Sequence, residues 1–297
     1  MMEQRSVDLD GPVHYADFGG SGRAIVLVHG LGGSHANWLA IAPRLTGHGR
    51  VLAIDLAGHG YTPSLHRTAK VGANRQLLDR FLAEVVREPA VLIGNSMGGY
   101  IALAEAAAQP SRVAGLVLVG PAVPRVADAG FDREVIGFFA GVLLPGIGWG
   151  IMRRRARRGP AQNVRDSMAL CCVDPARVDP RVVEAHIAVA RDRVALGPVA
   201  GRDFLDAVRS LTAVLVRGRR YYAMVAGIRA PALIVQGARD RLVRVEAARV
   251  LAAARPDWQL SVLDDIGHVP QLEAPDQFLA IVEPWLRARL QPAASTA

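Results

Sequence analysis

Short, almost uninterrupted aliphatic runs recur along this chain and alternate with segments of helical periodicity. A strand that is aliphatic throughout must be covered on both faces, as the strands of parallel sheets are. Five such runs are present: Ala24–His29, Val51–Asp55, Ala90–Gly94, Gly115–Val119 and Ala232–Gln236. The helical segments between them are the crossover connections that parallel strands require. The alternation therefore predicts an α/β fold with a mostly parallel sheet.

Weaker signals extend this sheet at both ends. Val7–Leu9 and Val13–Phe18 are predicted to form an antiparallel entry hairpin that turns at Asp10-Gly11-Pro12, and Leu260–Leu263 is predicted to be the last strand. The predicted helices are Asn37–Leu45, Asn74–Arg87, Met97–Gln109, Val245–Ala254 and Pro275–Leu290. The small, polar tail at 291–297 is expected to be frayed.

The alternation is interrupted once. Roughly a hundred residues separate Gly120-Pro121 from the next strand at Ala232, which is too long for a loop. This segment is helix-like and is divided by prolines at 145, 160, 175, 180 and 198. We expect a helical cap over the C-terminal edge of the sheet, where open α/β folds bind ligands. The predicted division is a core of residues 1–121 and 230–297 and a cap of residues 122–229.

Composition bounds the class of protein. The chain has 297 residues, of which 51% are hydrophobic and 21% charged, so one globular domain with a large insertion is expected. Its net charge of +8 comes almost wholly from arginine, since Lys70 is the only lysine. A basic balance can indicate nucleic acid, an anionic membrane or an acidic substrate. The arginines are spread along the chain without a nucleic-acid-binding motif, so no nucleic-acid partner is expected.

Two features bear on location. The adjacent Cys171 and Cys172 fit neither a disulfide framework nor a metal-binding spacing, because neighbouring cysteines bridge only with strain. Free thiols are typical of a reducing compartment. The segment Met1–Phe18 carries four acidic residues and no apolar core, unlike a signal peptide. A cytoplasmic location is therefore expected, and the sequence gives no indication of oligomeric state.

The chemistry centres on Gly94-Asn95-Ser96-Met97-Gly98-Gly99. A predicted strand leads into this turn and a predicted helix leaves it. Small residues two positions before and after Ser96 let strand and helix come close, and the strained turn exposes the hydroxyl. The helix N-terminus beneath it favours developing negative charge. In this strand–turn–helix context Ser96 is a strong candidate nucleophile.

A serine nucleophile needs a base, and the base needs a carboxylate that fixes its tautomer. His268 follows the last predicted strand, from where its loop can reach back over the sheet. Asp240 directly follows the strand Ala232–Gln236, whereas Gly120-Pro121 offers no acid after the preceding strand. The order Ser96, Asp240, His268 is the order expected of such a site.

Acyl transfer also needs donors for an oxyanion. The segment His29-Gly30-Leu31-Gly32-Gly33 follows the strand that ends near Val28, and its glycines can turn backbone N–H groups inward. We predict that the N–H groups of Leu31 and Met97 form the oxyanion hole. His29 itself is expected to hydrogen-bond within the structure rather than to catalyse.

At this point the sequence resembles the α/β-hydrolase superfamily, specifically its capped bacterial branch. Four blocks match in order: His29-Gly30-Leu31-Gly32, Asp55-Leu56-Ala57-Gly58-His59-Gly60, Gly94-Asn95-Ser96-Met97-Gly98-Gly99, and the segments around Asp240 and His268. They lie within residues 24–121 and 230–288. The resemblance implies an eight-stranded sheet and a Ser-His-Asp triad, with neither metal nor organic cofactor.

The resemblance leaves several activities open. Ser96 argues against haloalkane dehalogenases and epoxide hydrolases, which have an aspartate at that position, and Met97 replaces the aromatic residue common in cofactor-free haloperoxidases. Hydrolases of meta-cleavage C–C bonds share the elbow, and Asn37 resembles their polar residue near the oxyanion loop. They usually carry a tryptophan after the histidine, where this chain has Val269.

We expect an esterase or lipase-like enzyme that cleaves a carboxylic ester of a hydrophobic small molecule. Gly30, Asn37 and Val269 are the predicted substrate-binding residues. A C–C bond hydrolase is the alternative, followed by a thioesterase or lactonase. A non-catalytic ligand-binding protein is the alternative from another class, because fold alone does not establish catalysis.

One apolar stretch lies inside the predicted cap. Val135–Met152 contains eighteen residues without a charge and is followed at once by an arginine-rich run, 153–158. Its length reaches the threshold for a membrane span, but a span would separate Ser96 from Asp240 and His268. Two interpretations remain: a pair of cap helices that line an apolar substrate tunnel, or a peripheral segment, 135–158, whose arginines contact anionic lipid head groups.

Overall fold

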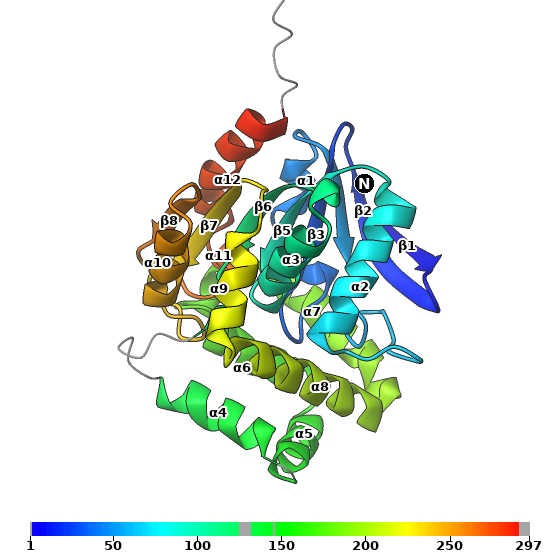
Figure 1. Cartoon of the computed structure of the whole chain (residues 1–297). Helices are drawn as coiled ribbons and strands as arrows, with labels where there is room; N and C mark the ends of the chain where they lie inside the picture. Colours follow the sequence, from blue (N-terminus) through cyan, green and yellow to red (C-terminus); the bar gives the residue numbers. More distant parts are fainter. Residues whose placement is uncertain (1, 125–131, 145, 291–297) are drawn as a thin grey trace, which may run out of the picture.

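The computed structural model describes residues 2–124, 132–144 and 146–290, so Pro145 and the predicted frayed tail lie outside the described residues. Eight strands form one sheet in the order β1-β2-β4-β3-β5-β6-β7-β8 (Figure 1). The strands are β1 (Glu3–Asp8), β2 (Pro12–Gly19), β3 (Ala24–Val28), β4 (Arg50–Ile54), β5 (Ala90–Asn95), β6 (Val113–Val119), β7 (Ala232–Gly237) and β8 (Gln259–Leu263). The predicted eight-stranded sheet is therefore confirmed.

The predicted strand directions are also confirmed. β1 pairs antiparallel with β2, and β2 with β4, whereas the remaining neighbours are parallel. In the parallel part Val28 pairs with Gly94, and Asn95 pairs with Val119. The loops that leave β3, β5 and β6 therefore emerge side by side at one edge of the sheet. This edge carries the candidate functional residues.

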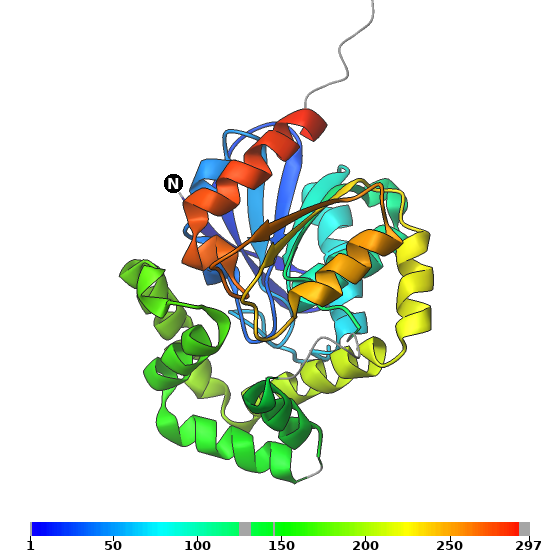
Figure 2. The same ribbon diagram turned by 90° about the vertical axis from the view of Figure 1, so that its left-hand side faces the viewer.

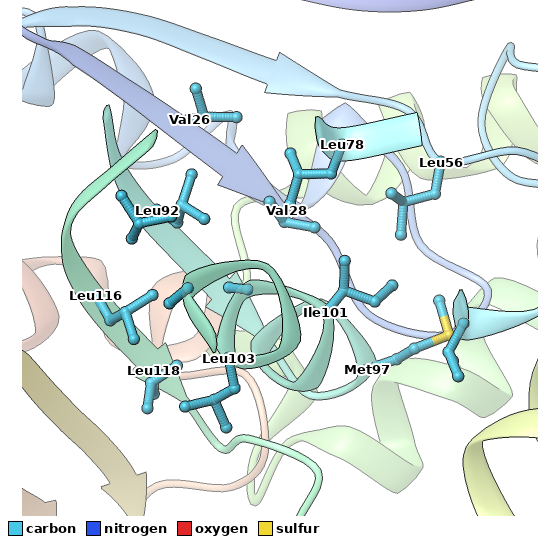
Figure 3. Packing of buried hydrophobic residues seen from close by; sticks show 14 of the residues in the cluster. Val26, Val28, Leu56, Leu78, Leu92, Met97, Ile101, Leu103, Leu116 and Leu118 are labelled. Atoms are coloured by element: carbon cyan, nitrogen blue, oxygen red, sulfur yellow. The ribbon is translucent and has the colours of Figure 1, made fainter. Parts of the chain in front are cut away.

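Helices cover both faces of the sheet, because side chains along each strand alternate between two hydrophobic clusters. Val26 and Val28 lie in the cluster that packs against α2 (Val71–Phe81), α3 (Met97–Ala108) and α10 (Val245–Ala254), as Figure 3 shows for part of it. Ile25 and Leu27 lie in the opposite cluster, against α1 (Ala42–Leu45) and α12 (Pro275–Leu290). Burial on both faces explains why these strands are aliphatic throughout.

Six α-helices stand between β6 and β7 among the described residues: α4 (Arg133–Leu143), α5 (Ile147–Arg158), α6 (Pro160–Cys171), α7 (Pro180–Asp192), α8 (Pro198–Leu215) and α9 (Gly218–Ala226). Figure 2 shows most of them beyond one end of the sheet, which matches the predicted helical insertion after strand 6. Prolines begin α6, α7 and α8, since the first helical position needs no N–H donor.

The end of this insertion belongs to the core. Leu211, Tyr221 and Val225 pack into the same hydrophobic cluster as α3, and the Tyr221 hydroxyl donates a hydrogen bond to the carbonyl of Ala122. Residues 207–228 thus help to cover the sheet, although the proposed domain division places them in the cap. That division, with core residues 1–121 and 230–297, stays a prediction.

Two helix predictions need correction. The expected helix Asn37–Leu45 is instead a 3₁₀ turn, His35–Trp38, followed by the short α1. The side chains of Ser34 and Asn37 cap this turn reciprocally, which favours a separate turn over a continuous helix. The expected helix Asn74–Arg87 begins earlier, at Val71, and its last turn is a π-helical segment, Leu82–Val86.

Candidate active site

Ser96 occupies the turn between β5 and α3 in a strained backbone conformation, with φ 54° and ψ −115°. A β-carbon added to Gly94 would lie 2.6 Å from the Gly98 carbonyl oxygen, and one added to Gly98 would lie 2.1 Å from the Val28 carbonyl oxygen. Only glycine therefore fits at these two positions. The close approach keeps the serine, half-buried, at the N-terminal end of α3.

His268 and Asp240 form a buried hydrogen-bonded pair, with 2.7 Å between His268 Nδ1 and Asp240 Oδ2. The other carboxylate oxygen of Asp240 accepts from the backbone N–H groups of Leu242 and Val243, at 2.8 and 2.9 Å. Gln236, at the end of β7, donates its side-chain amide to Asp240 Oδ2 at 2.9 Å. Four donors are thus directed at the carboxylate and fix its orientation.

The pair lies next to the candidate nucleophile because three strand ends converge. A β-carbon on Gly120, which has a φ of 47°, would lie 3.1 Å from His268 Nδ1 and 3.2 Å from Asp240 Oδ2. The side chain of Asn95, the residue before Ser96, donates to the carbonyl oxygens of Val119 and His268, at 2.9 and 3.2 Å. Ser96, Asp240 and His268 are therefore brought together at the C-terminal edge of the sheet.

The loop after β3 also lies beside Ser96. A β-carbon on Gly30 would lie 3.2 Å from Cβ of Ser96, so this backbone passes directly beside the candidate nucleophile. His29 Nδ1 donates to the Gly30 carbonyl at 2.7 Å, while its Nε2 accepts from the Leu56 N–H at 3.1 Å. Burial lowers the pKa of His29, which matches the neutral tautomer that these partners require.

The two proposed oxyanion donors flank Ser96. Met97 is the first residue of α3, and the first intrahelical bond runs from the Tyr100 N–H to the Ser96 carbonyl at 3.1 Å. The Met97 N–H therefore has no acceptor within its own helix. Leu31 directly follows Gly30, whose backbone lies beside Ser96. Leu31 and Met97 remain the proposed oxyanion hole.

A buried carboxylate after β4 binds the chain just beyond the loop that follows β3. Asp55 accepts from the backbone N–H of His35 at 2.6 Å and from that of Tyr61 at 2.8 Å. The Nδ1 atoms of His14 and His35 lie 2.7 and 3.0 Å from its Oδ2. Burial alone would raise the pKa of Asp55, yet these imidazole hydrogen bonds hold it well below its ordinary value.

The side chains of His14, His35 and Asp55 are also the one potential metal-ligand group among the described residues, since their ligand atoms lie within 4.8 Å of one another. The carboxylate oxygens of Asp55 are already directed at N–H donors of His14, His35 and Tyr61. We therefore interpret the cluster as a hydrogen-bonded support of the loop. Asp55 belongs to one of the matching sequence blocks, but the sequence did not predict that it supports this loop.

The predicted substrate-binding residues have different surroundings. Gly30 lies beside Ser96, whereas the Asn37 side-chain oxygen accepts from the Ser34 N–H at 3.0 Å and is thus engaged locally. Val269 is buried in a small hydrophobic cluster with Leu272 and with Met168 from α6. Val269 therefore contacts the insertion, and its role in substrate binding stays a prediction.

The insertion is fastened to the histidine loop by a glutamate whose role was not predicted. Glu273, in α11 (Pro270–Glu273), is buried. One carboxylate oxygen accepts from the N–H groups of Val173 and Asp174, at 2.8 and 2.9 Å, and the other from the Gly267 N–H at 2.8 Å. The Leu272-Glu273-Ala274-Pro275 segment follows His268 closely, but nothing in its pattern indicates a partner a hundred residues away.

Both cysteines are free thiols at this junction. The Cys171 carbonyl accepts from the His268 N–H at 2.6 Å. Burial raises the pKa of the Cys171 thiol to about 12, with the Asp240 carboxylate as a further cause. A thiol with that pKa stays protonated, so Cys171 is not a competing nucleophile at neutral pH.

Apolar side chains from three inserted helices face the oxyanion loop. Leu31 packs with Phe138 of α4, Met152 of α5 and Phe204 of α8 around one buried cluster. A β-carbon on Gly32 would lie 3.5 Å from the Phe204 ring. The approach to the loop after β3 is therefore lined by hydrocarbon.

Comparisons with known proteins agree with this fold. The family model described as "Alpha/beta hydrolase family" matches residues 25–281. The esterase structure from Thermogutta terrifontis superposes with a TM-score of 0.72 at 23% identity, covering 97% of this chain and 100% of that one. At this identity the superposition is evidence of a shared fold.

Two curated relatives match most of the chain. A 2-hydroxy-6-oxononadienedioate/2-hydroxy-6-oxononatrienedioate hydrolase 1 of Dechloromonas aromatica is 27% identical over 94% of this chain and 92% of that protein. The dihydrolipoyllysine-residue acetyltransferase component of an acetoin cleaving system of Pseudomonas putida is 29% identical over 87% of this chain. The match spans 62% of that relative's length. With the family model covering nearly its whole length, the chain belongs to the alpha/beta hydrolase family.

Proposed function

We propose that the protein is a serine hydrolase that cleaves a carboxylic ester of a hydrophobic substrate. Ser96 is the proposed nucleophile, His268 the base, and Asp240 the residue that orients the base. Leu31 and Met97 are the proposed oxyanion donors. No metal or organic cofactor takes part in this mechanism.

The observation that carries the proposal is the buried 2.7 Å contact between His268 Nδ1 and Asp240 Oδ2. An ionised carboxylate can only accept, so Nδ1 carries the proton and Nε2 carries a lone pair. That lone pair is the feature a general base needs. The parallel pairing of β5, β6, β7 and β8 supports this assignment, since Ser96, Asp240 and His268 follow the carboxyl ends of β5, β7 and β8.

The reaction proceeds in two acyl-transfer steps. His268 Nε2 takes the hydroxyl proton as Ser96 Oγ bonds to the ester carbonyl carbon, and the oxyanion is stabilised by the N–H groups of Leu31 and Met97. The tetrahedral intermediate expels the alkoxide, which receives that proton from His268. Water then attacks the acyl-enzyme with His268 as base, releasing the carboxylic acid and restoring Ser96.

The hydrocarbon lining supports a hydrophobic substrate. Leu31, Phe138 and Phe204 pack against the same buried cluster near the proposed oxyanion loop. An acyl or aryl group placed against them leaves water, which is worth about 25 cal/mol for each Å² of apolar surface buried. Longer esters should therefore bind more tightly as long as the added carbon atoms contact this lining.

A C–C bond hydrolase is the second candidate, favoured by the 27% identity to the Dechloromonas aromatica hydrolase over 94% of this chain. That relative's name specifies a dienedioate, which carries two carboxylates. A dianion needs compensating cations or donors in its pocket. The apolar lining around Leu31 therefore favours the ester over such a substrate.

Turnover of p-nitrophenyl esters of graded acyl length, beside a meta-cleavage dienoate, distinguishes the candidates. The proposal expects ester turnover that rises with acyl length and is lost in Ser96→Ala. Faster turnover of the dienoate, again lost in Ser96→Ala, would support the C–C hydrolase. Equal turnover by wild type and Ser96→Ala would exclude Ser96 as the nucleophile. Ligand binding without turnover by the wild type would identify a non-catalytic binding protein.

A further inference from the structure

The end of the α4–α5 pair exposes large apolar side chains. Leu144, Ile147 and Trp149 are 51%, 52% and 37% exposed. Single exposed apolar side chains are common on protein surfaces, whereas a group of them marks an interaction site. A β-carbon on Gly201, in the first turns of α8, would lie 3.6 Å from the Trp149 ring, and nearby Val199 is 38% exposed. We call Leu144, Ile147, Trp149 and Val199 the apolar tip.

Arginines follow the apolar tip along α5. Arg153, Arg154 and Arg157 are exposed, and none of them has an ion pair among the described residues. The neighbouring Arg158 differs, because it is paired with Asp166 at 2.7 Å. The acidic residues at the start of α4 do not pair with these arginines, since Asp132 and Glu134 both bind Arg241. Among the residues that the structure describes, no carboxylate therefore compensates the positive charge of Arg153, Arg154 and Arg157.

The spacing along α5 suits a membrane interface. With a rise of 1.5 Å per residue, Arg153 and Arg157 lie about 9 and 15 Å along the helix from Ile147. Interfacial segments bury their apolar side about 5–10 Å deep, at the boundary of head groups and acyl chains. With α5 directed away from the bilayer and Ile147 at the acyl boundary, arginines at this spacing lie within reach of the lipid phosphates.

The position of this pair in the molecule leaves it accessible. Figures 1 and 2 show α4 and α5 at the end of the molecule that lies farthest from the sheet, beyond α8. Among the described residues no single helix is long and apolar enough to cross a bilayer, and α4 and α5, which qualify only together, bend by 113°. The geometry suits a shallow insertion of the apolar tip, with the body of the protein outside the bilayer.

We propose that the apolar tip, with Arg153, Arg154 and Arg157, binds the surface of an anionic phospholipid bilayer. The apolar side chains insert at the acyl boundary, and the guanidinium groups bind head-group phosphates. Charge complementarity selects this partner over an uncharged apolar surface, because three unpaired arginines beside the tip would oppose burial against hydrocarbon alone. The interaction is independent of the reaction proposed for Ser96.

Cosedimentation with vesicles of phosphatidylglycerol and phosphatidylcholine, against phosphatidylcholine alone, tests the proposal. The wild type should bind the anionic vesicles at about 0.01 M salt and dissociate at about 1 M, where the Debye length falls from ~30 to ~3 Å. Replacing Arg153, Arg154 and Arg157 by glutamine should lower the partition coefficient about 100-fold. Absence of wild-type binding at low salt would overturn the proposal.

The chain offers a matched control for charge. Arg217, Arg219 and Arg220 are exposed and also lack an ion pair among the described residues. They lie at the start of α9, beyond the other end of α8, and the α8 helix between them and Val199 is roughly 25 Å long. Replacing them by glutamine makes the same change in net charge and should leave most of the binding intact. An equal loss in both triple variants would show unspecific attraction and overturn the assignment to the tip.

Tryptophan fluorescence tests insertion directly. Of the four tryptophans, Trp38, Trp258 and Trp285 are buried and Trp149 is 37% exposed. Vesicle binding should therefore shift the emission to shorter wavelength in the wild type and not in Trp149→Phe, which should still bind. Binding without any shift would exclude insertion of the tip.

A second copy of the chain on this face would instead appear in ultracentrifugation as a lipid-independent dimer that Ile147→Asp dissociates, and would overturn the proposal. The thermal unfolding midpoint confirms that each variant is folded.

Discussion

The backbone carbonyl of Cys171 accepts a hydrogen bond from the backbone N–H of His268, with 2.6 Å between oxygen and nitrogen. The last residue of α6 thereby holds the proposed base from outside the sheet. Space for this contact exists because the preceding residue is Gly267, where a β-carbon would lie 2.3 Å from the same carbonyl oxygen. The inserted helices are thus part of the structure that positions the histidine.

Glu273→Gln tests whether this junction positions His268. The carboxylate accepts three backbone N–H groups, and the amide NH₂ of glutamine cannot accept, so at least one buried donor loses its partner. We expect a loss of stability of about 1–3 kcal/mol. We also expect kcat for a soluble ester to fall more than KM changes, because the base is displaced while the apolar wall is retained. A stability loss with unchanged kcat would reduce Glu273 to a purely structural role.

Asp240→Asn should lower kcat by about 10⁴-fold with the fold intact, because the amide no longer fixes the required histidine tautomer. Gln236→Leu, which removes one donor to Asp240 Oδ2, should have a much smaller effect in the same direction. Ester kinetics over pH and far-UV circular dichroism measure both. If Asp240→Asn and wild type had comparable kcat, a residue other than Asp240 would have to orient His268.

Gly98→Ala should prevent the elbow from forming. The added methyl group would lie 2.1 Å from the Val28 carbonyl oxygen, which requires β3 and α3 to move apart. We expect destabilisation of roughly 3 kcal/mol or failure to fold. Gly72→Ala in α2 is the control, since nothing lies within 4 Å of a β-carbon there, and it should retain or slightly raise the unfolding midpoint. Equal midpoints for the two variants would contradict the described packing.

Acid sensitivity should depend on His59. Burial lowers its pKa from 6.5 to about 3, while its Nδ1 lies 3.1 Å from the Ala57 carbonyl. Between these two values the unfolded chain binds a proton that the folded chain does not. Stability therefore falls as pH falls from 6.5 toward 3, by up to about 1.4 kcal/mol per pH unit for this residue.

Urea unfolding of wild type and His59→Gln over this pH range measures the contribution. Glutamine can still donate to the Ala57 carbonyl but does not titrate, so the difference in unfolding free energy between the two proteins should shrink as pH falls. Parallel curves for the two proteins would show that His59 does not carry the effect.

Local sequence signals were sufficient for the sheet and for the candidate site. The two glycines around Ser96 report a backbone approach that only a strand–turn–helix elbow requires, and Asp240 and His268 follow recognisable strands. Their position at one edge follows from parallel pairing, because the carboxyl ends of β5, β6, β7 and β8 lie along the same edge. These relationships are set within a few residues or by the rules of sheet topology.

Other features depend on contacts that no local pattern encodes. Glu273 and Val173 are a hundred positions apart and join through backbone N–H groups, which any residue supplies. The Asn37–Leu45 helix was wrongly predicted because Ser34 and Asn37 cap each other in a turn, a side-chain arrangement that competes with helix continuation. Hydrophobic periodicity does not register either effect.

The junction of Cys171 with His268 has a consequence for how substrate enters and leaves. The hydrogen bond that seats the proposed base is the one that α6 would have to break in order to swing outward. Outward movement of that helix would remove one of the contacts that hold His268, beside those to Asp240 and Asn95. We therefore expect the arrangement with this hydrogen bond intact to be the reactive one.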